Sequence, residues 1–512
     1  MEQFILTATL AFTVYILCLL GYRLTLHPLA KFPGPLIAKL TDGFGGFYAL
    51  RKDIHLKIYE DHMTYGHVVR YGPDRLIFNT ESAFQTIYNS DRVTKSHVYR
   101  AAQQHADQFN IFNVRDRGMH RAKRRLIGQV VSEKSMRSFE PVMLQQIDVL
   151  LQKLMKASAS SAPVNITPTV RQLGIDIVGH LGFGYNLKMQ TEETNHWLMN
   201  AFYLGDWRIN VCMQWPLLTW IRPEVISGLM PNSIRARLFN LLDTMIKARL
   251  SQKIDSKHDL LGVIAGSMGN EFKSLRQQEL WTEALFFFPA GGETTATAIS
   301  AAFFYLTRNR ECYKKLADEI RSSFSSGSEI RQGPQLASCR YLRAVIDESL
   351  RMCPSVPGVL WRELVTGDDG TEPFIVDGHV IPKGTQFGVH IFSLHHNEEI
   401  FPRPFEFRPE RWLEAKDEEA RKAMDRGFAA FSTGSRGCAG KPMGYLECSL
   451  VLAKTLWYFD FEKVSDLGGG VPGLPGIRGR INHFQVDDTF AATHNGPSIK
   501  FVPRPEVSHE LN

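Results

Sequence analysis

The sequence predicts a mainly α-helical protein with small β-sheets, preceded by one membrane-spanning helix. Three observations predict this fold class. A charge-free apolar run covers Phe4–Tyr22, long stretches with helical spacing of apolar residues dominate the rest, and short strand-like runs cluster in three places. We therefore expect a membrane anchor at residues 1–22, a hinge at residues 23–36 and one large domain at residues 37–512.

Composition excludes several classes of protein. The chain has 512 residues, enough for a large core, and a net charge of +6, which is too slight for a dedicated nucleic-acid binder. Its seven cysteines show no CxxC or Cys/His spacing, so a zinc site or a disulfide framework is not expected. The odd cysteine count fits a reducing compartment.

The apolar run near the N-terminus is long enough to cross a bilayer at about 1.5 Å per residue. A cleaved signal peptide is the alternative, but Met1–Gln3 carries no positive charge and no small-residue cleavage site follows the run. Arg23 and Lys31 follow the run, so the positive-inside bias predicts that the main body lies in the cytosol. Phe32–Pro35 (FPGP) then predicts a stiff, non-helical hinge.

Periodicity predicts the elements of the large domain. Helical spacing is found at Met143–Met155, Ser233–Lys253, Gln277–Thr307 and Tyr341–Met352, and loops are predicted at Lys156–Pro163 and Leu467–Pro475. Strands are expected within Val68–Phe78, Phe374–Val389 and Ile481–Val502. In the second of these, Asp377-Gly378 between two apolar triplets predicts a two-residue hairpin turn.

The most informative stretch is FSTGSRGCAG, in which Phe431, Gly434, Arg436, Cys438 and Gly440 form the pattern Phe-x-x-Gly-x-Arg-x-Cys-x-Gly. Five specified positions at roughly one-in-twenty usage would occur by chance about once in several thousand chains of this length. A lone cysteine in a glycine-rich loop is usually a small buried residue, which is our interpretation of Cys212 and Cys448.

The chemistry of an iron thiolate explains the spacing around Cys438. The sulfur needs a tight loop whose backbone amides point at it, and Gly434 and Gly440 permit that close approach. Arg436 offers a fork of donors suited to a carboxylate of the cofactor, and Phe431 would shield the sulfur from water. We therefore predict that Cys438 is the axial ligand of a haem iron.

The loop resembles the haem-binding signature of the cytochrome P-450 family, and two segments upstream agree with it. Glu348-Ser349-Leu350-Arg351 is similar to the family's ExxR motif, in which the i, i+3 spacing places both charges on one helix face. Pro409–Trp412 is similar to the PERW segment, so the resemblance implies a Glu348–Arg351–Arg411 network that clamps the haem loop. Alone, an ExxR pair would more often be a solvated surface pair.

A third segment, Ala290–Thr295 (AGGETT), resembles the family's A-G-x-D/E-T-T motif above the haem. The resemblance implies that Glu293 and Thr294 relay protons for dioxygen activation. The alternative is an amphipathic helix with a glycine-induced kink. Pro289 departs from the aliphatic residue usual in the family, and we expect it to distort the helix because it removes a backbone donor.

Cationic partners for the haem carboxylates are also implied. His120 and Arg124, at i, i+4 on one helix face, are similar to the family's propionate-binding pair, and Arg362 matches another propionate-binding arginine. The neighbouring charges Arg121, Lys123 and Arg125 are either a solvated helix face or, together with Lys441, a basic docking surface for an acidic reductase.

The resemblance implies a cytochrome P-450 fold, haem b, and a monooxygenase that uses dioxygen to oxidise an apolar small molecule. Electrons would come from an NADPH-dependent cytochrome P-450 reductase in the endoplasmic reticulum membrane, because the sequence has no Rossmann glycine fingerprint. The general likeness is to fungal enzymes of specialised metabolism. Two alternatives are a haem-thiolate isomerase or dehydratase of the same fold, which Glu293 and Thr294 disfavour, and a non-enzymatic haem-binding protein.

Substrate identity is not encoded in a motif. By resemblance, the pocket is lined by segments within Tyr99–Phe112, Phe286–Ala290, Val356–Trp361 and Phe490–Asn495. Their phenylalanines suggest an apolar, aromatic or terpenoid ligand, although a phenylalanine stripe is more often packing than substrate contact.

Overall fold

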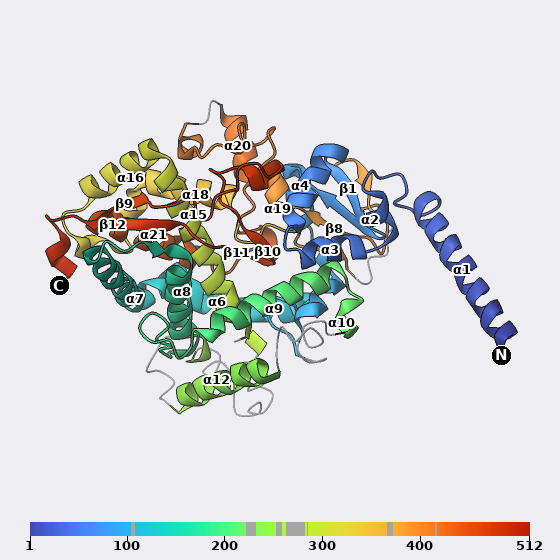
Figure 1. Ribbon diagram of the computed structural model, residues 1–512, viewed down its shortest axis with the longest axis horizontal. Coiled ribbons are helices and arrows are strands. Elements are labelled where there is room, and N and C mark those ends of the chain that lie inside the picture. Colours follow the sequence, from blue (N-terminus) through green and yellow to red (C-terminus); the bar gives the residue numbers. More distant parts are fainter. Residues whose placement is uncertain are drawn as a thin grey trace.

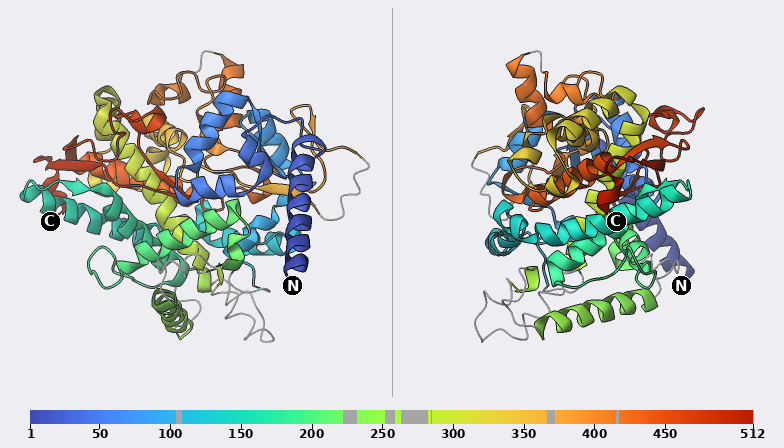
Figure 2. Two further views of the ribbon diagram at one scale, coloured as in Figure 1. Left: turned by 45° about the vertical axis from the view of Figure 1, so that its right-hand side comes forward. Right: turned by 90° about the vertical axis from the view of Figure 1, so that its left-hand side faces the viewer.

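The computed structural model describes residues 1–103, 108–221, 232–251, 259–262, 282–283, 285–365, 372–414 and 417–511. Helices make up most of the body, and the small sheets lie on two sides of it (Figures 1 and 2). The predicted fold class, mainly α with small β-sheets behind one apolar N-terminal helix, is confirmed.

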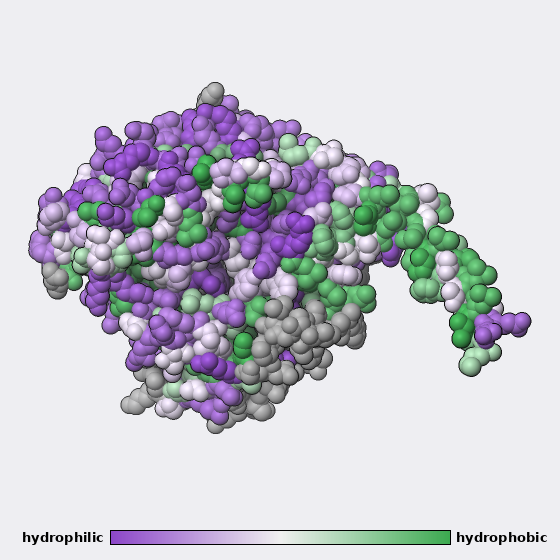
Figure 3. Space-filling view, viewed as in Figure 1, coloured by the Kyte–Doolittle hydropathy of each residue, from purple (hydrophilic) through white to green (hydrophobic). Residues whose placement is uncertain are grey.

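The N-terminal helix α1 (Glu2–Thr25) buries none of its residues in the body. It projects from the rest of the molecule as an apolar rod (Figure 3). By length and apolar composition, α1 could span a bilayer, which is consistent with the predicted membrane anchor. The FPGP segment is non-helical, as predicted, but it is attached to the first sheet, since the Arg70 backbone N–H donates to the Pro33 carbonyl at 2.7 Å.

The helices of the body begin near the anchor and continue to the C-terminal third. Their bounds are α2 Leu36–Leu40, α3 Gly43–Leu50, α4 Ile54–Tyr65, α5 Glu81–Asn89, α6 Arg117–Val131, α7 Glu133–Ala159, α8 Ile166–Phe183, α9 Trp197–Gln214, α10 Leu218–Ile221, α12 Asn232–Leu250, α15 Thr294–Arg308, α16 Arg310–Ser323, α17 Pro334–Ser338, α18 Arg340–Met352, α19 Ile391–His395, α20 Glu418–Gly427 and α21 Lys441–Tyr458. The π-helical turn η4 (Pro289–Glu293) leads directly into α15.

One helix prediction needs correction at both ends. Helix α7 begins ten residues before the predicted Met143 and continues to Ala159, so the first half of the predicted loop 156–163 is helical. Alanine and lysine sustain a helix, and the chain leaves it only at Ser160. Helix α12 is close to the predicted 233–253, and α18 is within one residue of its prediction. Of the predicted helix 277–307, residues 277–281 and 284 lie outside the described part.

Among the described residues, four sheets accompany the helices. Strands β1 (Val68–Gly72), β2 (Arg75–Phe78), β8 (Gln386–Val389), β5 (Arg362–Leu364) and β3 (Val93–Lys95) form a five-stranded sheet in that order, and β4 (Val164–Asn165), β12 (Ser498–Pro503) and β9 (Phe459–Lys463) form a three-stranded sheet. The remaining pairs are the hairpins β6–β7 (Ile375–Val376, His379–Val380) and β10–β11 (Asp487–Thr489, Ala491–Thr493).

The predicted hairpin turn is confirmed. Ile375 pairs with Val380, and the two turn residues between β6 and β7, Asp377 and Gly378, both have positive φ (48° and 76°). A two-residue turn with two positive φ angles matches the right-handed twist of the strands, which is why Asp-Gly is favoured there.

The main hydrophobic core surrounds α15. This helix is buried along most of its length and packs against α8, α18 and α21 (Figure 1). A second core lies between the five-stranded sheet, α5 and the segment before Cys438. Because α15 and the start of α21 belong to one packed unit, the π-helical turn and the cysteine loop are held at fixed positions around a shared cavity.

Candidate active site

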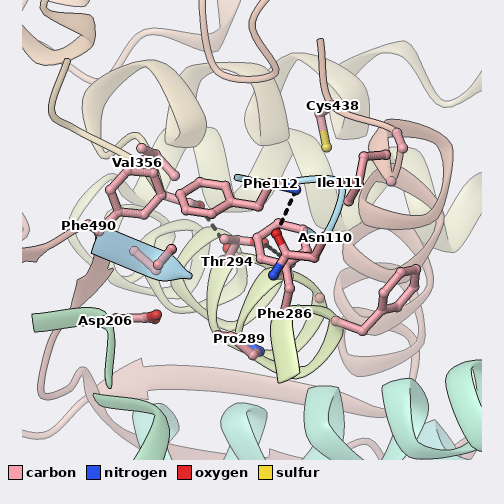
Figure 4. A pocket seen from close by; sticks show the side chains of 18 of the residues that line it. Asn110, Ile111, Phe112, Asp206, Phe286, Pro289, Thr294, Val356, Cys438 and Phe490 are labelled. Carbon is pink, nitrogen blue, oxygen red and sulfur yellow. Dashed lines mark hydrogen bonds between the residues drawn. The ribbon is translucent and has the colours of Figure 1, made fainter. Parts of the chain in front are cut away.

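A cavity of about 490 Å³ lies in the middle of the body and is lined by Cys438 on one side and Thr294 on the other (Figure 4). Of the seven cysteines, Cys18 and Cys438 are exposed and the other five are buried. Cys18 is on the anchor helix, whereas the Cys438 sulfur is deep in the protein and its exposed surface faces this cavity.

Backbone groups shape the loop that presents Cys438. The Cys438 N–H donates to the Phe431 carbonyl at 2.8 Å and closes the loop, while Phe431 lines the same cavity. Gly434 has φ 69°, and a Cβ there would lie 2.2 Å from the Tyr88 carbonyl oxygen, so only glycine fits. Burial raises the pKa of the Cys438 thiol above its usual value, and the backbone N–H groups of Gly440 and Lys441, which donate to the sulfur, offset part of this rise. The loop therefore directs backbone donors at the sulfur, as an iron-bound thiolate requires.

The predicted Glu348–Arg351–Arg411 network is present and completely buried. The Glu348 carboxylate accepts from Arg351 Nε and Nη2 and from Arg411 Nε, each at 2.9 Å, and from Trp412 Nε1 at 3.0 Å. Burial alone would raise the pKa of Glu348, but the two guanidinium groups outweigh it and hold that pKa below its usual value. The carboxylate is therefore a fixed negative charge.

His395, which sequence reasoning missed, connects this network to the cysteine loop. Arg351 Nη1 donates to the His395 carbonyl at 2.9 Å, and His395 Nε2 accepts from the Ala429 backbone N–H at 2.8 Å. Burial lowers the pKa of His395 to about 3, so the ring is neutral and can accept this bond. The ring also stacks on Phe428. The ion network thus positions the chain just ahead of Phe431.

Cationic side chains gather in the part of the cavity beside the cysteine loop, and Arg208 and Arg235 also line the cavity. Four were predicted there, namely His120, Arg124, Arg362 and Arg436, and the structure adds Lys95 from β3, which no sequence motif indicated. Arg436 donates to the Val114 and Arg115 carbonyls at 2.8 and 2.9 Å, and Lys95 donates to carbonyls of Ile111 and Phe112. Among the described residues, none of the five cationic groups forms an ion pair with a carboxylate.

The pKa values record this uncompensated positive charge. Burial and then Arg362 lower the pKa of Arg436 to about 10. Burial, Arg436 and Lys95 lower the pKa of His120 to about 3. Two carboxylates, which a haem provides, would neutralise this cluster, and the sulfur loop lies beside it, since Arg124 donates to the Gly437 carbonyl. The residues present therefore fit a haem with Cys438 as axial ligand and its carboxylates toward Arg124, Arg362 and Arg436.

On the other side of the cavity, the structure separates the predicted acid–threonine pair. Thr294 lines the cavity, and its hydroxyl donates to the Ala290 carbonyl at 2.6 Å. Glu293 does not line the cavity; its carboxylate forms two hydrogen bonds, of 2.6 and 2.7 Å, with Arg171 of α8. Neighbouring residues on a helix point about 100° apart, and here Thr294 is turned toward the cavity whereas Glu293 is turned toward Arg171. Arg171 carries no sequence signal that would have identified it.

Pro289 begins the π-helical turn, as its missing N–H would favour. The turn packs closely on α8: a Cβ on Gly174 would lie 2.9 Å from the Gly292 carbonyl oxygen, and one on Gly291 would lie 2.5 Å from a Val178 methyl group. The glycines of the AGGETT segment thus allow helix contact as well as space beside the cavity.

The walls between these two sides are largely apolar. All four predicted segments contribute, with Phe112, Phe286, Val356 and Phe490 among the lining residues, and Phe112 stacks on Phe286 with ring centroids 5.0 Å apart (Figure 4). Sequence reasoning missed the part of the wall formed by α9, which supplies Phe202, Gly205, Asp206 and Ile209. The signal available was an acidic residue, Asp206, inside a largely apolar helical stretch.

One part of the predicted docking surface was wrong. Lys123 is not exposed; its side chain is 11% exposed and pairs with Glu283 at 2.9 Å, which ties α6 to the helix above the cavity. Arg121, Arg125 and Lys441 are exposed. The sequence of α6 does not indicate which of its clustered cationic residues (Arg121, Lys123, Arg124 and Arg125) turn toward the protein interior.

A cavity-facing cysteine sulfur that accepts backbone hydrogen bonds, beside cationic groups that form no ion pair among the described residues, is the arrangement expected of a haem-thiolate protein. The family model for cytochrome P450 matches residues 44–468. The chain is 35% identical to cytochrome P450 monooxygenase poxM of Penicillium oxalicum, over 96% of this chain and 93% of that protein. It is 33% identical to cytochrome P450 monooxygenase apf7 of Gibberella fujikuroi (94% and 95%) and 32% identical to AKT7 of Alternaria alternata (95% and 95%). The chain belongs to the cytochrome P450 family and is a haem-thiolate monooxygenase.

Proposed function

We propose that this monooxygenase inserts one oxygen atom into a C–H or C=C bond of a largely apolar small molecule in a fungal specialised-metabolite pathway. The observation that carries the proposal is the cavity, whose aromatic and aliphatic walls reach both Cys438 and Thr294. Apolar walls with a few polar groups are typical of sites that bind hydrophobic ligands. The curated fungal relatives support the metabolic setting.

When bound, the haem supplies dioxygen activation. The residues of the chain would hold and tune it: Cys438 ligates the iron, the Gly440 amide stabilises the sulfur, and Arg124, Arg362 and Arg436 pair with the haem carboxylates. We assign Thr294 the role of presenting a hydroxyl at the cavity surface for proton transfer. Glu293 does not reach the cavity from its position on the helix, because its carboxylate is turned away and hydrogen-bonded to Arg171.

We place the enzyme in the endoplasmic reticulum membrane, with residues 1–22 as anchor, residues 23–36 as connection and residues 37–512 in the cytosol. Arg23 lies on the body side of the apolar helix and supports this orientation. Leu36, Ile37 and Phe47, each more than half exposed, lie shortly after the anchor and would contact lipid.

The electron donor in this proposal is an NADPH-dependent cytochrome P450 reductase, which docks on Arg121, Arg125 and Lys441. These three residues are exposed, and Arg124 between them donates to the backbone of the cysteine loop, so a partner bound there would lie close to the sulfur. Replacing all three with glutamate should slow haem reduction by the reductase and reduce its salt dependence, while dithionite reduction stays unchanged. An unchanged reductase rate would reject this surface.

The function is tested by expressing the full chain in a fungal or yeast host and recording the carbon monoxide difference spectrum of its membranes. Turnover of candidate terpenoid or aromatic intermediates is then measured with and without NADPH and reductase. Oxygenated products that require both support the proposal. Products that form without NADPH would indicate an isomerase or dehydratase instead.

A further inference from the structure

Asp206 of α9 is the feature of the cavity that the proposed function leaves unexplained. Its side chain lines the cavity and only 9% of the residue is exposed. No described residue forms a hydrogen bond or an ion pair with its carboxyl group. Buried polar groups are nearly always paired, so an unpaired acid facing a cavity points to a partner that the folded chain itself does not supply.

The neighbouring cation cannot serve as that partner. Arg171 lies close enough to affect Asp206 electrostatically, but its Nε and Nη2 donate to Glu293, and Nη2 also donates to the Met199 carbonyl at 2.9 Å. Glu293 adds a negative charge to the surroundings of Asp206. The local charges therefore disfavour a second carboxylate and favour the neutral acid form.

The position of Asp206 relative to the reacting centre defines what it could bind. Figure 4 shows Asp206 and Cys438 on opposite sides of the cavity, with Thr294 and the rings of Phe112 and Phe286 between them. A ligand that touches Asp206 would thus be held at the end away from the haem, and the intervening space is apolar and aromatic. One polar contact in such surroundings sets the orientation of the ligand.

We propose that Asp206 is a substrate-anchoring residue, and that the substrate is an otherwise apolar molecule whose hydroxyl or carbonyl oxygen hydrogen-bonds to this carboxyl group at the end remote from the oxidised carbon. Burial and then Glu293 raise the pKa of Asp206 well above its usual value, which favours the neutral acid form, and that form can donate to an oxygen acceptor. This inference rests on the proposed function and specifies the substrate class of the same cavity.

The test measures ligand binding to the ferric holoenzyme in detergent. The spin-state change in the haem spectrum reports the binding. The probes are three rigid hydrocarbons, decalin, cedrane and androstane, each paired with its monohydric alcohol and ketone. Because the oxygenated probe gains one buried hydrogen bond, at least one alcohol or ketone should bind about 10-fold more tightly than its hydrocarbon. If no oxygenated probe binds more tightly than its parent, the proposal is wrong.

Variants separate the anchoring role from a structural one. Asp206→Leu should bring the alcohol-to-hydrocarbon affinity ratio close to one and leave hydrocarbon binding within about 3-fold, whereas Asp206→Asn should keep most of the preference. Asp243→Leu, which removes a partly exposed acid paired with Lys247 on α12, is the matched control and should change nothing. An Asn variant that loses as much as the Leu variant would indicate a cationic ligand and overturn the proposal.

These measurements use no NADPH, reductase or turnover, so they are independent of the monooxygenase reaction. A wild-type protein without a thiolate carbon monoxide band would contradict the haem assignment itself. A wild-type protein that has the band but binds the alcohols and ketones no more tightly than their parent hydrocarbons contradicts only the role of Asp206. If Asp206→Leu does not fold, the Asn variant and the wild-type probe series decide the question.

Discussion

Replacing Glu348 with glutamine should destabilise the haem domain more than any other single change in the buried ion network. In the native protein one carboxylate faces two guanidinium groups, Arg351 and Arg411, and accepts from Trp412 and the Arg408 backbone N–H as well. Glutamine removes the only negative charge and leaves two buried cations without a counter-charge. The single carbonyl oxygen of glutamine cannot accept hydrogen bonds from all the donors that point at the carboxylate in the native protein.

The magnitude follows from the burial of the network. Breaking a fully buried pair by removing one partner costs about 3–5 kcal/mol. Folded domains have a total free energy of unfolding of about 5–15 kcal/mol, so the change removes a large fraction of it. Arg411→Met should cost less, because the neutral Glu348–Arg351 pair stays intact. Combining the two substitutions should cost less than their sum, since the second removes one of the stranded cations.

The assay is the fraction of purified protein that carries thiolate-ligated haem, together with the temperature at which the haem absorption is lost. Glu406→Gln is the matched control, because it removes an exposed ion pair with Arg403 from the segment between the ExxR and PERW motifs. Such exposed pairs contribute about 0–1 kcal/mol. A Glu348→Gln protein with the haem content and thermal midpoint of the control would refute the reasoning.

Three further predictions follow from the site. Cys438→Ser should abolish the thiolate-specific carbon monoxide band, and a variant that keeps the band would show that another group ligates the iron. Arg171→Met should lower the thermal midpoint by stranding Glu293 as a buried charge, and Glu293→Gln in the same chain should restore most of the loss; equal midpoints for the single and double variants would contradict this. Burial raises the pKa of Glu447 to about 8, above the ~4.3 of an unfolded glutamate, so its contribution to stability is present below about pH 4 and is lost as the pH rises toward 8. Between pH 5 and 8 the thermal midpoint of the Glu447→Gln variant should therefore fall less than that of the wild type. The same pH dependence in both proteins would contradict the raised pKa of Glu447.

Sequence reasoning predicted the parts of the site that depend on local spacing. The cysteine loop has its five specified residues within ten positions, and Glu348 and Arg351 are three residues apart on one helix, so their geometry is encoded locally. The apolar N-terminal helix and the β6–β7 turn were predicted for the same reason. In each case a short pattern of charge, glycine or apolar residues determines the structure without reference to distant segments.

What sequence reasoning missed depends on tertiary contact. Arg171 is 122 residues from Glu293, and their pairing follows from α8 packing on the π-helical turn. Lys95 reaches the cationic cluster because β3 pairs with β5, which carries Arg362. His395 joins the ExxR network to the cysteine loop through two backbone contacts, which leave no pattern in the sequence. Lys123 was assigned to the surface for the same reason, since its partner is 160 residues away.

The cavity is electrically asymmetric, and this asymmetry bears on how a substrate would lie in it. At one end Lys95, Arg124, Arg362 and Arg436 have no carboxylate among the described residues, and the haem carboxylates would satisfy them. Once that end is neutralised, Asp206 is left as the acidic group that faces apolar walls without a partner of its own. A neutral molecule with one oxygen remote from its reactive carbon matches this arrangement. The same argument explains why Glu293 is turned toward Arg171: an ionised acid on the cavity side of the helix would need a counter-charge that the apolar walls do not provide.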